Sequence, residues 1–255
     1  MKILALETTG RYGSAAVIDD DGRIWHASST EEMNHLRGMI SLIDEAVTKA
    51  GIGKDDLTHM AASVGPGSFT GIRIGVTTAR TMAQMLGLPC IGVSSTEALA
   101  KGALADAVSA GARLIVPVIN ARRHQTYAAV FEADREAESL VPVLEEKQYM
   151  IEELLEELRA RLGEHDGAAV YFTGDGIDAY GGIIEGALPE GSFMFAAGDK
   201  RYQSAGPVSE IALEKARAGE TVGYDGLMPE YMRLAEAEQK LRAGTLSDRI
   251  RTAKV

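Results

Sequence analysis

The sequence repeats one order of secondary-structure elements in its two halves, and this repeat constrains the fold more than any other feature. In the first half, apolar alternation and turn residues predict three antiparallel strands, with the acidic run and glycine at residues 19–22 as a hairpin turn. Helices and strands then alternate. The predicted strands are at 2–8, 13–18, 23–28, 57–64 and 89–93, and the predicted helices are at 34–50, 68–86 and 96–108.

The second half follows the same order, although the two halves share little sequence. Its predicted strands are at 114–119, 125–131, 140–144, 168–173 and 192–195, and its predicted helices are at 150–162, 177–184 and 208–218. A duplicated order of this kind predicts an α/β protein with the two-lobed actin-like, or ribonuclease-H-like (ASKHA), fold, in which each lobe is a mixed five-stranded sheet with flanking helices. We expect an N-terminal lobe at 1–108, a C-terminal lobe at 109–226 and a partly helical extension at 227–255.

Charge and cysteine content narrow the classes of function. The chain has 255 residues, a formal net charge of −11 and one cysteine, Cys90. A lone cysteine forms no internal disulfide and no thiolate zinc site, so we expect a reducing, cytoplasmic setting. The apolar run at residues 3–6 is too short for a signal peptide, and no run reaches the roughly 20 apolar residues of a membrane span, so we expect no membrane association. Because an acidic protein repels phosphates, we expect a partner to hold any RNA.

A glycine-rich turn at residues 65–75 joins a predicted strand to a predicted helix. Its glycines permit unusual backbone angles and close packing, and its hydroxyl side chains can cap the helix. The free amides of a helix start can also hold an anion, although the Gly-Lys-Ser/Thr of a Walker A loop is absent. Structural turn and phosphate cradle both stay open, and we favour the first. The residues concerned are Gly65, Gly67, Ser68, Thr70, Gly71, Arg73 and Gly75.

Other turns lie where actin-like kinases bind nucleotide. The first strand-to-strand turn begins with Glu7, an acid followed by hydroxyls, and a hairpin with locally satisfied hydroxyls is the alternative interpretation. The corresponding turn of the second lobe begins at Asn120, where a kinase would need an acid to hold a metal-bound water or act as a base. We therefore predict no catalytic residue. The candidate remnants of a nucleotide site are Glu7, Thr8, Thr9, Gly10, Asn120, Gly174 and Gly176.

The histidines do not form a metal-binding pattern. His35 lies in a predicted helix, but the position one turn later is Met39, whereas a metal would require a pair at helical spacing. We therefore predict no metal site.

Five motifs occur in the order found in one bacterial family. They are ILALET at residues 3–8, GPGSFTGIRIG at 65–75, IGVSS at 91–95, NARR at 120–123 and PEYMR at 229–233. On these motifs the sequence resembles the TsaB, or YeaZ, family from residue 1 to about residue 235. The resemblance implies the ASKHA fold and a role in forming N6-threonylcarbamoyladenosine at position 37 of tRNAs that read codons beginning with A. The family usually has Asp-Ala-Arg where this chain has Asn120-Ala121-Arg122.

The resemblance also implies partners. In the family, the catalytic paralogue TsaD carries a metal-binding histidine pair and performs the transfer, and an ATPase, TsaE, joins the two proteins. TsaB-like proteins bind TsaD through the N-terminal lobe and form homodimers through much the same surface, and tRNA is reached only through the complex. The implied partner surface lies on the helices at 34–50 and 69–86, whose apolar stripes could equally be core. Its candidate residues are Leu36, Met39, Ile40, Ile43, Met82 and Met85.

We therefore expect a non-catalytic scaffold that activates a TsaD-type paralogue. No cofactor is expected to be required, and binding of ATP or ADP within the complex is left open. One alternative is an independent ATP-binding enzyme of kinase or ATPase type that uses Glu7, Thr8, Asn120 and Gly174. A less favoured alternative is an inactive metallopeptidase homologue, in keeping with the older label glycoprotease-like.

Overall fold

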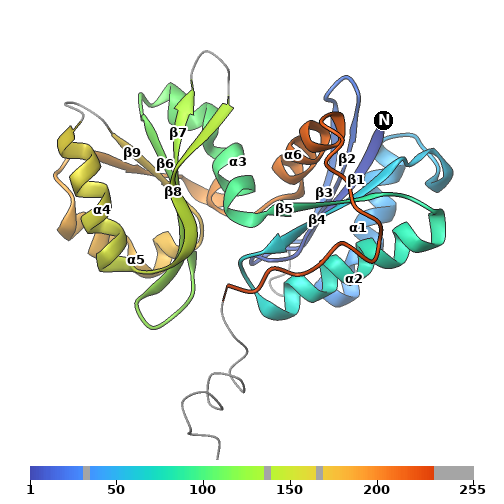
Figure 1. The fold of residues 1–255 in the computed structure, drawn as a ribbon, viewed down its shortest axis with the longest axis horizontal. Coiled ribbons are helices and arrows are strands. Elements are labelled where there is room, and N and C mark those ends of the chain that lie inside the picture. The colour runs from blue at the N-terminus through green and yellow to red at the C-terminus, as the bar shows by residue number, and fades with distance from the viewer. Residues whose placement is uncertain (31–34, 135–138, 165–168, 233–255) are drawn as a thin grey trace, which may run out of the picture.

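Two five-stranded sheets stand side by side with helices between and outside them (Figure 1). The computed structural model describes residues 1–30, 35–134, 139–164 and 169–232. The predicted fold class is confirmed: both sheets are mixed and both carry flanking helices. The predicted elements that fall within the described residues are all present, and most of their ends differ by a few residues from the sequence-based expectation.

The first sheet has the strand order β3-β2-β1-β4-β5. Strands β1, β2 and β3 are antiparallel, whereas β4 and β5 run parallel to β1. Helices α1 and α2 cover one face, because their apolar stripes pack on the inward side chains of β1, β2 and β4. The elements are β1 Lys2–Glu7, β2 Ser14–Asp19, β3 Ile24–Ser28, α1 His35–Lys49, a short 3-10 helix Lys54–Asp56, β4 His59–Gly65, α2 Phe69–Leu86 and β5 Cys90–Ser94.

The second sheet has the order β10-β9-β6-β7-β8 and repeats the pattern of three antiparallel strands followed by parallel ones. Helices α4 and α5 cover its outer face. The elements are β6 Leu114–Asn120, β7 Gln125–Asp134, β8 Ser139–Met150, α4 Ile151–Glu164, β9 Val170–Thr173, α5 Gly176–Ala187, β10 Phe193–Phe195 and a 3-10 helix Gly198–Arg201.

Strand β8 is much longer than the predicted strand at 140–144. The charged stretch at 145–148 has little strand propensity, but it pairs with β7, and in this stretch partly buried and exposed residues alternate. Pairing at a sheet edge therefore overrides local preference here.

The two remaining helices, α3 Ser95–Ser109 and α6 Ala205–Arg217, lie between the sheets (Figure 1). Each packs on the sheet built from the other half of the chain. Helix α3 buries Ala103 and Leu104 against Ile115 and Phe131 of the second sheet. Helix α6 buries apolar side chains such as Ile211 against the first sheet. Both helices thus pack across the predicted lobe boundary at residue 108.

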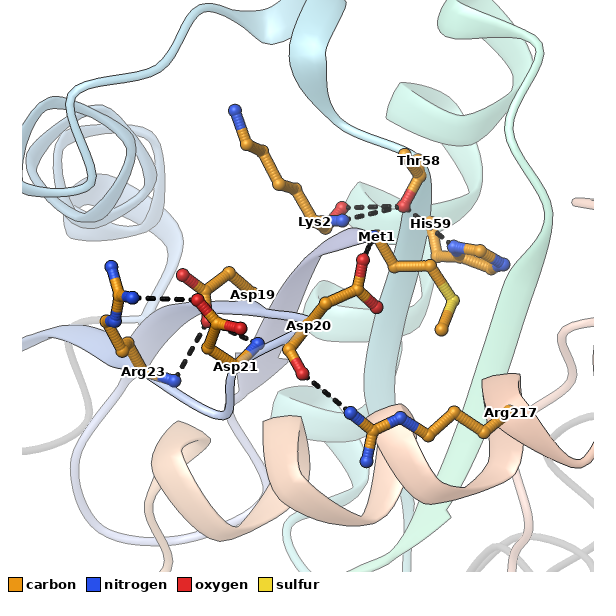
Figure 2. A network of polar contacts seen from close by, with 9 residues as sticks. All are labelled: Met1, Lys2, Asp19, Asp20, Asp21, Arg23, Thr58, His59 and Arg217. Carbon is orange, nitrogen blue, oxygen red and sulfur yellow. Dashed lines mark hydrogen bonds and ion pairs between the residues drawn. The ribbon is translucent and has the colours of Figure 1, made fainter.

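The C-terminal end of α6 is tied to the β2–β3 hairpin. Arg217 Nη2 donates a 2.6 Å hydrogen bond to the carbonyl oxygen of Asp20, and the Asp20 carboxylate accepts from the amino group of Met1 (Figure 2). On the neighbouring strand, the Lys2 amide donates to Thr58 Oγ1 at 2.9 Å. These contacts hold α6, the hairpin and the start of β1 together.

After α6 the chain returns along the first sheet as an extended strap, residues 219–232. Val222 and Cys90 exchange backbone hydrogen bonds, Leu227 enters the core, and the Glu230 amide donates to the Val64 carbonyl at 2.8 Å. The described part of the strap contains no helix. Most of the predicted extension at 227–255 lies outside the described residues, as does residue 34, where the first helix is predicted to begin.

Candidate functional site

Two turns occupy equivalent positions in the two sheets, one after β1 and one after β6. Each follows the middle strand of its sheet and leads into the antiparallel neighbour. They are also the turns at which the sequence predicts remnants of a nucleotide site. Their surroundings are very different.

The acid of the first turn is sealed inside the protein. Glu7 is 0% exposed, and its carboxylate accepts hydrogen bonds from the Thr9 hydroxyl at 2.6 Å and from the Ser63 hydroxyl. Burial raises the pKa of Glu7, although the hydrogen bonds from Ser63 and Thr9 oppose this effect. The Thr9 hydroxyl also lies 3.0 Å from Ser95 Oγ at the start of α3. Glu7 therefore organises the interior and is not open to a ligand.

The glycine-rich turn packs directly on the residues that follow Glu7. Thr8 Oγ1 donates to the Gly71 carbonyl at 2.7 Å, and the Ser68 amide donates to the Thr9 carbonyl at 2.8 Å. A Cβ at Gly71 would overlap the Thr8 carbonyl oxygen, and one at Gly67 would lie 2.6 Å from the Thr9 carbonyl oxygen. The glycines thus permit a close backbone approach, and the chain itself fills the space at the start of α2.

Ser68 caps helix α2: the Gly71 amide donates to its Oγ at 3.2 Å. Gly75 lies one helical turn after Gly71, and a Cβ at Gly75 would overlap Thr8 Oγ1. The side chain of Thr70 is exposed. The strap adds a further contact, because a Cβ at Gly65 would overlap the Glu230 carbonyl oxygen.

The two most distinctive sequence motifs meet in space. Arg73 of the glycine-rich turn donates from Nε to the Tyr231 hydroxyl at 2.9 Å, and its guanidinium lies 3.9 Å from the centroid of the Phe69 ring. The Phe69 and Tyr231 rings are 4.7 Å apart between centroids. The strap therefore stabilises the first turns of α2 through an aromatic and cationic cluster.

The second turn is open and basic. The Asn120 amide donates to Asp175 Oδ1 at 2.9 Å, and Asn120 Oδ1 accepts from the Arg122 amide at 2.8 Å. The Tyr180 hydroxyl lies 3.1 Å from the same Asn120 oxygen. Burial raises the pKa of Asp175. Asn120 therefore holds the turn through its side-chain oxygen.

Glycines bring α5 close to this turn. A Cβ at Gly174 or Gly176 would collide with the Val118 backbone of β6. As in the first lobe, the glycines accommodate neighbouring backbone.

Hydrogen bonds between side chains link the neighbourhoods of the two turns. Arg11 Nη1 donates to the Tyr202 hydroxyl at 3.0 Å, and that hydroxyl donates to Asp178 Oδ2 at 3.1 Å. Arg201 donates to the other Asp178 oxygen at 2.6 Å. The buried Gln203 covers Gly10 so closely that a Cβ there would overlap its amide oxygen. Gln203 thus occupies the space above Gly10.

Sequence reasoning missed these linking residues. Arg11 and Tyr202 are separated by 191 positions, so no local pattern links them. Tyr180 looks like an ordinary apolar position of a helix, although its hydroxyl reaches the second turn.

The candidate interface residues differ widely in burial. Ile40 is 68% exposed and Met85 is 80% exposed, whereas Met39 and Ile43 are buried in the first core. Met82 is partly buried against that core. The side chain of Leu36 lies outside the described residues.

Among the residues that the structure describes, no group of three or more His, Cys, Asp or Glu side chains gathers as a metal site would. Within the same part of the chain, no helix is long and apolar enough to cross a membrane.

Comparison with known proteins identifies the family of this chain. The family model for TsaD, the tRNA N6-adenosine threonylcarbamoyltransferase, matches residues 29–240. The tRNA threonylcarbamoyladenosine biosynthesis protein TsaB of Bacillus subtilis is 31% identical over 241 residues, which cover 94% of this chain and 97% of that protein. The chain belongs to the TsaB (YeaZ) family. TsaB of Escherichia coli is 28% identical over 241 residues, which cover 94% of this chain and 98% of the E. coli protein.

A solved structure agrees on the fold. A crystal structure from Pseudomonas aeruginosa, described as an uncharacterized protein with similarity to peptidase YeaZ, superposes with a TM-score of 0.74 at 21% identity. The match covers 91% of this TsaB-family chain and 99% of that chain. The two-lobed architecture is thus shared across nearly the whole length.

Proposed function

We propose that this chain is a non-catalytic subunit in the formation of N6-threonylcarbamoyladenosine in tRNA, and that it activates a TsaD-type transferase by binding it. Membership of the TsaB family supports the pathway, since its relatives are named as tRNA threonylcarbamoyladenosine biosynthesis proteins. The burial of Glu7 supports a non-catalytic role, because the acid that a kinase would use is sealed from ligands.

The observation that carries the proposal is a pair of large apolar side chains exposed on helices α1 and α2. Ile40 and Met85 project from these two contacting helices with 68% and 80% of their surface exposed. Large exposed apolar side chains on neighbouring elements are typical of a protein interface. The proposed partners are a TsaD-type paralogue or a second copy of this chain at these side chains, with a TsaE-type ATPase completing the complex in the cytoplasm.

The test mixes the purified chain with a TsaD-type transferase and the TsaE-type ATPase, and measures complex formation and threonylcarbamoyl transfer. Met85→Asp should weaken the complex at least about tenfold, because it places a charge in an apolar interface. The matched control is Val141→Asp, which alters an exposed apolar residue on β8 and should change the affinity less than about twofold. Threonylcarbamoyl transfer that is equally fast without this chain would contradict the proposal.

The chain is proposed to need no nucleotide of its own. Gln203 over Gly10 and the sealed Glu7 both support this part of the proposal. Calorimetry of the lone chain with ATP and magnesium should show no binding, and tight binding with turnover would favour the kinase or ATPase alternative instead.

A further inference from the structure

One exposed turn of this acidic chain combines basic side chains with a strained backbone. Arg122, Arg123 and His124, called here the basic turn, are three consecutive residues with positive φ angles of 63°, 53° and 60°. Side chains other than glycine rarely adopt such angles, and each costs on the order of 1–2 kcal/mol. All three side chains are exposed, although the net charge of the chain is −11. Strained backbone of this kind is often found at functional sites, so the strain suggests that this turn does more than reverse the chain.

Hydrogen bonds from the surrounding structure hold this conformation. The Arg122 amide donates to Asn120 Oδ1 at 2.8 Å, and the Arg122 carbonyl accepts from the Gln125 amide at 3.0 Å. The His124 carbonyl accepts from the Ile151 amide at the start of α4 at 2.9 Å. From α5, the Tyr180 hydroxyl lies 2.8 Å from the Gln125 carbonyl oxygen. The turn is therefore fixed in place before any partner arrives.

The two arginines are left available by this network. Neither guanidinium forms an ion pair with any residue in the described part of the chain. The nearby Glu152 is engaged by His124 instead, with its Oε1 at 3.1 Å from the ring Nδ1. That hydrogen bond also lowers the pKa of Glu152.

The surroundings of the basic turn favour phosphate over protein as its partner. Protein interfaces combine charge with large apolar side chains. In the described residues, the large exposed apolar side chains lie on α1, α2, β8 and the strap, and none belongs to the basic turn itself. Adjacent guanidiniums on a rigid support suit the oxygens of phosphate groups.

We propose that the basic turn binds the phosphate backbone of the tRNA, with Asn120 as the residue that positions it. The inference rests on the proposed function, which brings this chain to a tRNA-modifying complex. It departs from the sequence-based expectation that RNA is reached only through the partner. The overall negative charge would make this contact local and dependent on the basic turn alone.

The test uses the assembled complex of the chain with a TsaD-type transferase and an unmodified transcript of a tRNA that reads codons beginning with A. Fluorescence anisotropy measures tRNA affinity across salt concentrations. The double variant Arg122→Gly and Arg123→Gly removes both charges while glycine suits the positive φ angles, so the turn should keep its shape. We expect about tenfold weaker tRNA binding and a salt slope lower by about one to two.

Two control variants separate charge from structure. Arg122→Lys with Arg123→Lys keeps the charge and should lose less than about threefold in affinity. Arg23→Ala with Lys54→Ala removes the same charge from two exposed sites elsewhere and should change affinity less than about twofold. Unchanged tRNA affinity and salt slope in the glycine variant would overturn the inference.

Size-exclusion chromatography of the same samples distinguishes the remaining outcomes. If the glycine variant loses the transferase as well as the tRNA, the arginines contact the protein partner and the inference is overturned. If the wild-type chain does not bind the transferase, the proposed function fails. The same titration with the lone chain at low salt then decides the inference, with the glycine variant again expected to bind more weakly.

Discussion

The turn after β1 and the turn after β6 hold the same place in two copies of one sheet design, yet they have opposite characters. The first is buried: Glu7 is sealed and the residues after it pack against glycines of α2. The second is exposed and strained, and it carries two arginines. The comparison teaches that a duplicated fold conserves the route of the chain but not the use of a turn. One copy has become part of the core and the other part of the surface.

The largest effect is expected where the buried turn meets α2. Gly71→Ala should destabilise the protein by about 3 kcal/mol or more, because the new Cβ would overlap the Thr8 carbonyl oxygen and neither backbone segment can retreat. Gly182→Ala is the matched control, since this helical glycine of α5 has open space around it and alanine there should stabilise by up to about 1 kcal/mol. Urea denaturation measures both. Equal stability of the two variants would contradict the close packing.

A smaller effect is expected at the exposed turn. Asn120→Ala should cost about 1–2 kcal/mol, because the Arg122 amide loses its acceptor and the strained backbone loses a restraint. Asn120→Asp keeps an acceptor and should stay within about 1 kcal/mol of the wild type. Limited trypsin digestion gives a second measurement, with faster cleavage after Arg122 and Arg123 expected only in the alanine variant. A turn that resists trypsin equally in both variants would show that Asn120 does not hold it.

The smallest effect is expected for Glu7→Gln at acid pH. Near pH 4 this substitution should change the free energy of unfolding by less than about 1 kcal/mol. Glutamine can replace the protonated acid in the same hydrogen bonds. The folded protein raises the pKa of Glu7 above its ordinary value of 4.5, so the unfolded chain releases this proton first as the pH rises. Wild-type stability should therefore fall above that pH relative to the variant, and the difference should grow through the raised pKa. Denaturation from pH 4 to pH 8 measures this. Parallel curves for the two proteins would mean that Glu7 is ionised without penalty.

Much of the fold was accessible from the sequence because local patterns determine it. Periodicity and turn residues predicted the order of elements, and of the two hydroxyl residues that could cap the helix, Ser68 and Thr70, the structure uses Ser68. Contacts between distant residues were not accessible. Nothing in the sequence indicates that Glu230 lies against Gly65, or that Gln203 covers Gly10, since each pair is more than 150 positions apart.

The apolar stripe of α1 shows a further limit of predicting burial from the sequence. Met39 and Ile40 are neighbours in the sequence, and both fit a helical stripe about 100° wide or more. The structure buries Met39 at 2% exposure and leaves Ile40 at 68%. Composition does not separate a core position from a partner-facing one at the edge of the same stripe, because both are apolar.

The exchange of α3 and α6 between the sheets has a consequence for how the protein folds. The first sheet lacks its inner cover until residues 205–217 have been synthesised, long after its own strands. A chain stopped after α3 would leave Ile3, Ile91 and Val93 without the helix that buries them. The two lobes are therefore expected to fold and unfold as one cooperative unit, and a ribosome-bound chain remains incomplete until nearly all of it has emerged.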